Sequence, residues 1–136
     1  MRDPNGGLRP RQLVAWIGTQ VPFPVVRAVQ GAPLPEMPDV LAAVTITSGP
    51  GLSLEGAYDR IAFQVRCRGD QNAPEEGDDM AHDIDAALLT ADMPTIDGIP
   101  TLGFTRTGSG PTPLDTDDGE RETTVCTYMV QAASVL

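Results

Sequence analysis

Lysine, histidine and aromatic residues are scarce in this sequence. All nine basic residues are arginine, one residue is histidine, and only 4% of residues are aromatic. The Gly-rich segments SGPGLS and TGSGPT therefore lack the lysine of a phosphate-binding P-loop, and we expect both to be plain turns. A lone histidine argues against the usual zinc sites, which use two histidines or a cysteine pair. With so few aromatic residues, the core has to be built from aliphatic side chains and methionine.

Positive charge is also scarce. Nine arginines face 19 acidic residues, which gives a formal net charge of −10 and a pI near 4.2. Proteins that bind nucleic acid through its phosphates need clustered Lys and Arg, so this balance argues against direct DNA binding. It argues equally against an anionic membrane surface. The acidity suits a surface that DNA passes without binding to it, or it serves solubility alone.

No apolar run approaches the length of a signal peptide or a membrane span, so we expect neither. Cys67 and Cys126 fall in expected strands, too far apart for a zinc motif. Without a secretory signal, we expect both to be small buried hydrophobes that stay reduced.

The length of 136 residues fits one domain spanning residues 1–136. Glycine (14) and proline (13) make up about a fifth of the chain, which predicts long loops. We place these loops at residues 30–39, 48–58 and 108–120.

Hydrophobic periodicity predicts two helices and five strands. The helices cover about residues 10–18 and 72–91, and the strands about residues 23–29, 40–47, 58–70, 99–107 and 120–134. Proline at the start of the first strand marks it as an edge. Because most neighbouring strands are joined by loops and not by helices, we predict an α+β fold. Its sheet would be mostly antiparallel, with about five strands and two helices packed on one face.

The strand YDRIAFQVRCRGD alternates, so that Arg66 and Arg68 share the face opposite Phe63 and Val65. Two readings stay open for these arginines. Their stems can lie on an exposed strand face with the charged groups in water. Alternatively, their guanidinium groups can pair with carboxylates of another copy of the chain, which would make a head-to-tail contact.

Two acidic clusters could bind metal. His82 lies at helical spacing from Asp78, Asp79 and Asp85, and LDTDDGE spaces its aspartates somewhat like a calcium loop. The first cluster has no second histidine, and the second lacks flanking helices and the later bidentate glutamate. We therefore favour a solvated helix face and an exposed acidic loop. Trp16 remains either a core residue or an interface anchor.

The order of elements resembles the tail terminator proteins of long-tailed bacteriophages, also described as minor capsid or tail completion proteins. The similarity covers roughly Leu8 to Ala133. It rests on the strand PDVLAAVTIT, the strand DRIAFQVRCRG followed at once by the helix APEEGDDMAHDIDAALL, and the C-terminal GFTRTGSGPTPLDTDDGERETTVCTYMVQAA. The runs R-x-x-x-Q-V-x-x-R-G and P-x-x-x-D-x-G-x-R are its most specific parts.

The resemblance implies a structural virion protein and no enzyme. It implies a homo-hexameric ring on the head-proximal end of the tail tube, which stops tube polymerisation and joins the tail to the head. The partners would be other copies of the chain, the tail tube protein and the head–tail connector protein. DNA would pass through the bore without specific binding, and assembly would take place in the host cytoplasm. No membrane, catalytic residue, cofactor or metal is implied. The candidate interface residues are Arg66, Arg68, Asp115, Asp117, Asp118 and Arg121.

Three other functions remain open at this point. A head-completion or connector protein would also form a ring, one step nearer the capsid. A metal-dependent enzyme would use His82 and the neighbouring aspartates. A monomeric acidic binding module would never associate with itself.

Overall fold

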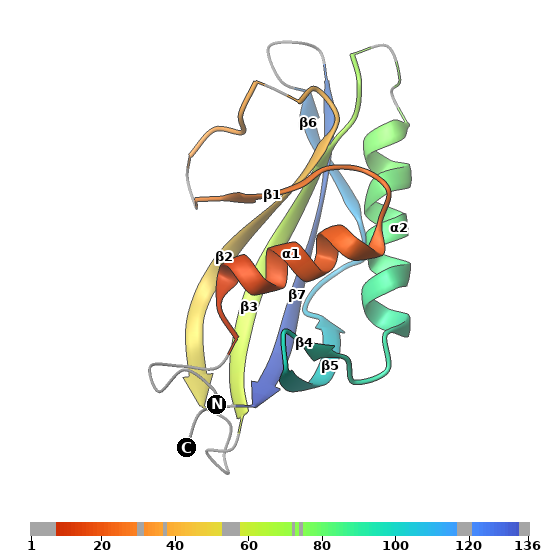
Figure 1. Ribbon diagram of the computed structural model, residues 1–136. Coiled ribbons are helices and arrows are strands. Elements are labelled where there is room, and N and C mark those ends of the chain that lie inside the picture. Colours follow the sequence, from red (N-terminus) through yellow and green to blue (C-terminus); the bar gives the residue numbers. More distant parts are fainter. Residues whose placement is uncertain are drawn as a thin grey trace.

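The structure is a computed structural model, and it describes residues 8–29, 32–36, 38–52, 58–71, 73, 75–116 and 121–133. In this part of the chain the helices are α1 (Pro10–Gln20) and α2 (Glu76–Thr90). The strands are β1 (Val25–Ala28), β2 (Leu41–Leu52), β3 (Tyr58–Arg68), β4 (Thr95–Ile96), β5 (Ile99–Arg106), β6 (Thr112–Thr116) and β7 (Glu122–Ala133). Figure 1 shows the long strands β2, β3 and β7 twisting behind α1, with α2 beside them.

The strands form one seven-stranded sheet in the order β1-β2-β3-β7-β5-β4, with β6 also paired to β7. β5 and β6 follow one another along the same edge of β7. β1 pairs with β2 in parallel, and the other pairs are antiparallel. The prediction of an α+β fold with two helices is confirmed. The predicted sheet is corrected, because it is mixed and has seven strands where we expected about five.

The parallel pair arises from the connection at residues 29–40. A parallel pair needs a crossover of about a dozen residues, which returns the chain to the start of the next strand. This connection has that length, and its described residues, 29, 32–36 and 38–40, lie in no helix or strand. β1 lies at the sheet edge, as the proline before it predicted.

Two predicted loops contain strand. β6 lies inside residues 108–120, where Pro111 and Pro113 concealed it. In the described part of the chain β6 pairs only with β7, and an edge strand of that kind tolerates proline. β2 continues to Leu52, so its last residues occupy the first part of the predicted loop 48–58. Its register with β3 shifts after Ile46 and again after Ser48. β4 is missed because it has only two residues.

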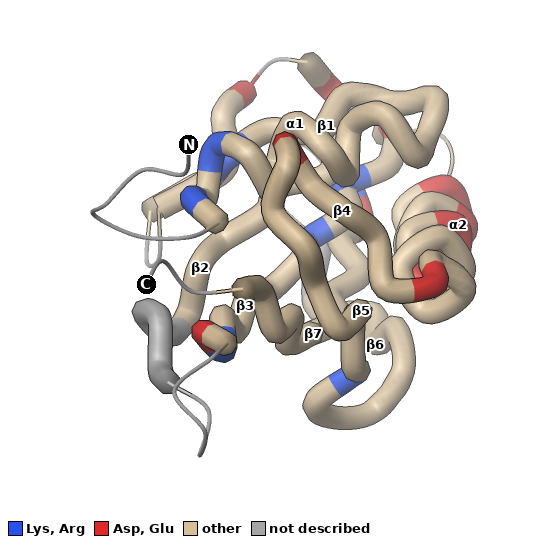
Figure 2. The backbone as a smooth tube through the Cα atoms, turned by 60° about the horizontal axis from the view of Figure 1, so that its bottom comes forward, with Lys and Arg blue, Asp and Glu red and all other residues tan. Residues whose placement is uncertain are grey.

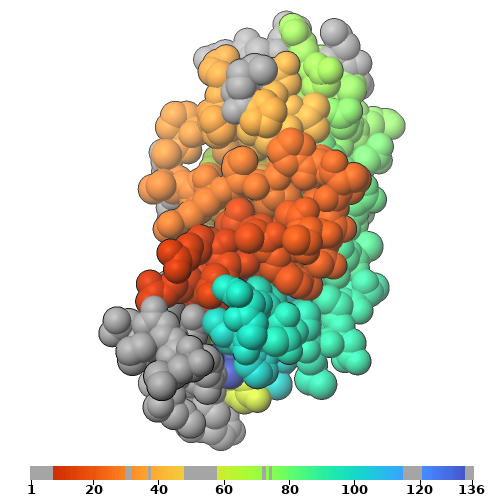
Figure 3. All heavy atoms as spheres, viewed as in Figure 1, coloured from red at the N-terminus to blue at the C-terminus, as the bar shows by residue number. Residues whose placement is uncertain are grey.

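Both helices cover the same face of the sheet, as predicted. Leu13 and Ile17 of α1 and Ile84 and Leu88 of α2 join one core cluster. The alternate residues of three central strands contribute to it: Ala42, Val44, Ile61, Phe63, Val65, Cys67, Cys126, Tyr128, Val130 and Ala132. Burying each large aliphatic side chain contributes roughly 1.5–3 kcal/mol. In the space-filling view, α1 and the β4–β5 hairpin close over the central strands (Figure 3).

The start of α2 approaches the sheet backbone very closely. A Cβ atom on Gly77 would lie 2.9 Å from the carbonyl oxygen of Cys67 and 3.0 Å from that of Glu122. One on Gly69 would lie 2.8 Å from the nitrogen of Gly77. Two glycines therefore let the first turn of α2 rest directly on the ends of β3 and β7.

Candidate interface residues

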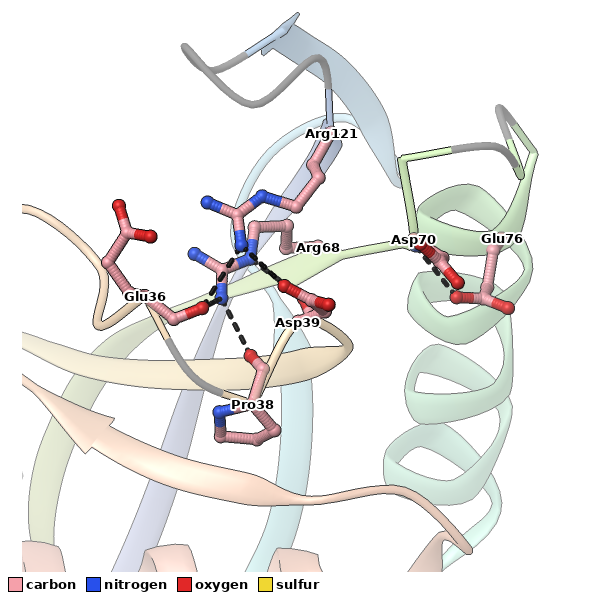
Figure 4. A network of polar contacts seen from close by, with 7 residues as sticks. All are labelled: Glu36, Pro38, Asp39, Arg68, Asp70, Glu76 and Arg121. Carbon is pink, nitrogen blue, oxygen red and sulfur yellow. Dashed lines mark hydrogen bonds and ion pairs between the residues drawn. The ribbon is translucent and has the colours of Figure 1, made fainter.

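Two arginines from different strands hold the connection between β1 and β2 (Figure 4). Arg68, the last residue of β3, donates from Nε to the carbonyl oxygen of Asp39 (2.9 Å). Its Nη2 donates to the carbonyl oxygens of Pro38 (2.7 Å) and Glu36 (3.2 Å). Arg121, just before β7, donates from Nη1 to the Glu36 carbonyl (3.1 Å) and to Asp39 Oδ1 (3.0 Å). We call Arg68, Arg121 and their partners Glu36, Pro38 and Asp39 the arginine clasp.

The clasp corrects the expectation that Arg68 holds its charge in water. Arg68 is 2% exposed and Arg121 is 8% exposed. Several charge-assisted hydrogen bonds to carbonyl oxygens offset the cost of removing a guanidinium group from water. Their role at an interface stays a prediction, while the structure gives both a role within the subunit. The sequence did not reveal Glu36, Pro38 and Asp39 as the acceptors, because backbone carbonyls outside helices and strands leave no sequence pattern.

Arg66 shares a sheet face with Arg68 but has a different environment. It lies opposite Ala43 on β2 and Val125 on β7, on the face that the helices do not cover. Its Nε and Nη2 are shielded from solvent, and the structure gives them no hydrogen-bond partner in the described residues. Burial lowers the pKa of Arg66 below its usual range.

Thr45 is a second polar residue on this face with an unmet hydrogen bond. It is 2% exposed, and its Oγ1 has no partner in the part of the chain that the structure describes. Thr45 lies opposite Gln64, and Ala43 lies opposite Arg66, so Thr45 and Arg66 occupy diagonal positions. A long side chain reaches across such a diagonal. Nothing in the sequence pattern indicated that Thr45 is buried.

The predicted acidic interface residues are only partly described. The backbone of Asp115 lies in β6 opposite Thr123. Asp117 and Asp118 lie outside the described residues. The structure therefore brings Arg68 and Arg121 together on the carbonyl oxygen of Glu36. In the described residues, Arg66 Nε and Nη2 bond to neither this oxygen nor another acceptor.

Acidic residues recur along α2, as the red bands in Figure 2 show. Glu76, Asp78 and Asp79 occupy its first turn, where the helix dipole favours negative charge. His82 Nε2 lies 3.6 Å from Asp78 Oδ2, and both side chains are well exposed. Among the described residues no group of three or more His, Cys, Asp or Glu side chains is arranged to hold a metal ion. This geometry fits a solvated helix face.

A polar network that the sequence did not predict ties α2 to the sheet. The hydroxyl of Tyr128 donates to Asp85 Oδ1 (2.9 Å), and Arg106 Nη1 lies 3.7 Å from Asp85 Oδ2. Burial raises the pKa of Tyr128 well above its usual value, and the hydrogen bonds with Cys126 and Asp85 act in the same direction. The neutral phenol therefore remains a donor to the carboxylate across the physiological range.

The two cysteines are buried and free, as predicted. Burial raises the pKa of Cys67 to about 12, with smaller contributions from Cys126 and Asp83. Such a thiol is a poor nucleophile at neutral pH, because the thiolate is the reactive form.

Trp16 packs at the edge of the core. Its ring stacks on Phe104 with centroids 5.4 Å apart, and Phe104 meets Phe63 edge to face at 5.9 Å. The core alternative for Trp16 is the one that these contacts support.

Comparisons with known proteins support the fold and give no family. No family model and no curated protein matches the chain. Among the described residues no helix is long and apolar enough to cross a membrane. One similar solved structure is a chain of the "virion of native gene transfer agent (GTA) particle", with a TM-score of 0.59 and 13% identity over 90% of each chain. Another, titled only by a sequence identifier, has a TM-score of 0.52 and 16% identity over 90% of this chain and 88% of the other. The chain is therefore similar in fold to a component of a virion.

Proposed function

We propose that this protein is a structural virion component that forms a hexameric ring at the head-proximal end of a phage tail tube. The ring stops tube polymerisation and joins the tail to the head. The observation that carries the proposal is the shared fold with a chain of a gene transfer agent virion, which extends over 90% of both chains. The order of elements that resembles tail terminators supports the same function.

The surface chemistry is compatible with this function. The formal charge of −10 would keep a ring from binding the DNA that passes through it. The ring itself needs two different surfaces on each subunit, because a heterologous contact closes only when unlike surfaces meet. The acidic helix α2, with its exposed carboxylates, is a candidate for one of them.

The first experiment measures the mass of the purified protein by light scattering, with negative-stain images of the same sample. Rings of hexameric size support the proposal. A protein that stays monomeric at high concentration, and also in the presence of tail tube protein, contradicts it.

The second experiment tests the position in the virion. The protein is added to its tail tube protein during polymerisation, and tube lengths are measured by electron microscopy. A tail terminator shortens the tubes and appears at one end of each. A connector ring forms the same particles but leaves tube length unchanged, so this outcome would replace our proposal with the neighbouring ring.

A further inference from the structure

The part of the chain that forms α1 and β1 carries positive charge only. Among residues 8–29 the charged side chains are Arg9, Arg11 and Arg27. Arg11 and Arg27 are exposed, and Arg11 lies roughly opposite the buried Leu13 around the axis of α1. Both side chains are therefore accessible to a partner.

Arg11 and Arg27 lie on the same side of the molecule. Arg27 on β1 pairs with Val44, whose side chain belongs to the core, so Arg27 points toward the sheet face on which α1 packs. α1 lies along β1, where a Cβ atom on Gly18 would be 3.8 Å from that of Val25. α1 begins, and β1 ends, on the side of the molecule away from α2 (Figure 1). We call Arg11 and Arg27 the basic edge.

α2 presents the opposite charge. Residues 70–97 include acidic side chains throughout and no lysine or arginine. Asp79 and Asp83 are exposed and lie one turn apart on α2. Like charges at this spacing repel each other, so a cation that binds between them stabilises the helix. We call Asp79 and Asp83 the acidic face of α2.

No ion pair within the described residues satisfies the basic edge or the acidic face. One carboxylate approaches α1, since Asp97 Oδ2 accepts a hydrogen bond from Gln12 Nε2 at 2.7 Å. It belongs to the β4–β5 hairpin, which lies on the other side of α1 from β1 (Figure 1). The basic edge does not reach the acidic face of its own subunit, because β1 is at one edge of the sheet and α2 packs on β3, β5 and β7.

An exposed apolar side chain accompanies each charged surface. Val29, two residues after Arg27, is 68% exposed, and Leu89, near the end of α2, is 40% exposed. Ion pairs in water contribute little, and they become stronger where water is excluded. A contact that covers Val29 and Leu89 removes water from the charges beside them.

We propose that the basic edge docks onto the acidic face of α2 in a second copy of this chain, so that Arg11 and Arg27 pair with Asp79 and Asp83. This contact rests on the proposed ring and identifies its two complementary surfaces. It joins unlike surfaces at two sides of one subunit, so it is heterologous and closes a ring when the rotation between subunits fits. It also lets copies that each carry a net charge of −10 meet through opposite charges.

Charge reversal tests both surfaces under the conditions in which the parent assembles. The double variants Arg11→Glu/Arg27→Glu and Asp79→Arg/Asp83→Arg should each raise the subunit–subunit dissociation constant at least tenfold, measured by analytical ultracentrifugation. Like charges then meet at every contact. The thermal unfolding of the isolated arginine variant should match that of the parent, because both arginines are exposed in the subunit.

Asp79 lies in the first turn of α2, where the helix dipole favours an acidic residue. Asp83→Arg alone is therefore made as a second variant that leaves this turn unchanged, and it should also weaken association. Parent-like association of folded Asp83→Arg and of the folded arginine variant would overturn the proposal.

Mixing the two double variants tests whether these surfaces face each other. An alternating ring of both variants has one parental contact and one reversed contact, and opposite charges meet in each. Assembly should therefore return in the mixture. If two folded variants that fail alone also fail together, α2 is not the occupant of the basic edge and the proposal is wrong.

Arg60→Glu is the matched control for a change in total charge. Arg60 is exposed and precedes the core residue Ile61 in β3, so it lies on the sheet face that the helices do not cover. The substitution changes the net charge as much as Arg27→Glu does, and association should stay at the parent level. An equal loss in both variants would show that total charge controls assembly, which contradicts a specific contact.

Failure of this contact can be told from failure of the proposed function. If Arg11→Glu/Arg27→Glu still forms rings and the parent shortens tail tubes, the contact is wrong and the function stands. If assembly depends on both surfaces and is rescued as described, but the parent does not affect tubes, the contact stands and the function is wrong. A parent protein that remains monomeric with and without tubes contradicts both.

Discussion

Arg68 and Arg121 both donate to the carbonyl oxygen of Glu36, at 3.2 and 3.1 Å. Two cations converge on one backbone acceptor because each has further partners nearby, including the Asp39 carboxylate 3.0 Å from Arg121. The arrangement joins the end of β3, the start of β7 and the irregular connection between β1 and β2. It fixes a proline-rich segment whose described residues, 32–36 and 38–40, belong to no strand.

The clasp predicts that Arg68→Met destabilises the protein by about 2–3 kcal/mol, since charged hydrogen bonds of this kind contribute about 1.5–3 kcal/mol. Arg68→Lys should recover little of this loss, because one ammonium group cannot reproduce the planar fork that reaches three carbonyls. Urea denaturation provides the measurement. Arg27→Met serves as an exposed control and should remain within about 0.5 kcal/mol of the parent.

The shared acceptor adds a second expectation. Arg121→Met combined with Arg68→Met should cost less than the sum of the single changes, because the second loss affects a segment that has already been released. Strict additivity would show that the two arginines act independently.

Gly77 and Gly18 predict opposite effects of the same substitution. Both lie in helices, where alanine is favoured over glycine by about 1 kcal/mol. At Gly18 the one described atom within 4 Å of an added Cβ is the Cβ of Val25, at an ordinary 3.8 Å, so Gly18→Ala should stabilise. At Gly77 it would meet two backbone carbonyls at 2.9 and 3.0 Å, so Gly77→Ala should destabilise by about 1–3 kcal/mol. Thermal unfolding of both variants checks the pair, and a stabilising Gly77→Ala would contradict the close approach of α2.

Helices and strands in which hydrophobic residues recur with a clear period were predictable from the sequence, and strands without such a period were not. The alternation in residues 58–68 and the apolar stripe at Met80, Ile84 and Leu88 predicted β3 and α2 well. β6 was missed because its prolines resemble a loop, and its strand character comes only from pairing with β7. The parallel pairing of β1 was missed because nothing within four residues specifies direction.

The candidate site shows the same division. Periodicity placed Arg66 and Arg68 on one face, which is correct, but exposure depends on what folds over that face. Glu36, Pro38 and Asp39 lie about thirty positions away from Arg68 in the chain and bind it through their backbone carbonyls. A contact between backbone carbonyls and a distant side chain has no signature in the sequence. The sequence therefore predicted the same role for Arg66 and Arg68, whereas the structure places them in different environments.

Cys67 predicts that stability falls at alkaline pH. Burial raises the pKa of its thiol from 9.0 to about 12 in the folded state. Below pH 9 the thiol is protonated in both states, and its contribution is fully present. Between pH 9 and 12 the unfolded chain releases the proton first, which lowers the free energy of unfolding, by about 2 kcal/mol at pH 10.5.

Urea denaturation at pH 7.5, 9 and 10.5 measures this slope. The raised pKa of Tyr128 adds a loss of the same sign above pH 10. Cys67→Ala removes one of the two groups, so its stability should decline less steeply than that of the parent, whatever the cost of the change at pH 7.5. An equal slope in the variant would show that Cys67 does not titrate as its burial implies.

The hairpin between β4 and β5 predicts a local effect of backbone conformation. Asp97 and Gly98 form its two-residue turn, with φ of 51° and 80°, and positive φ at both positions is typical of a type I′ turn. Gly98→Ala should destabilise by about 1 kcal/mol although no atom of the described residues lies within 4 Å of the added Cβ, because the cost is conformational. Gly108→Ala is the matched control, since Gly108 has no positive φ and its Cβ would make an ordinary 3.6 Å contact.

At Asp97, asparagine tolerates the same conformation and can still accept the hydrogen bond from Gln12 Nε2 (2.7 Å), so Asp97→Asn should be nearly neutral. Asp97→Val loses both features and should cost more than Gly98→Ala. Equal stability of the Gly98 and Gly108 variants would contradict the type I′ geometry.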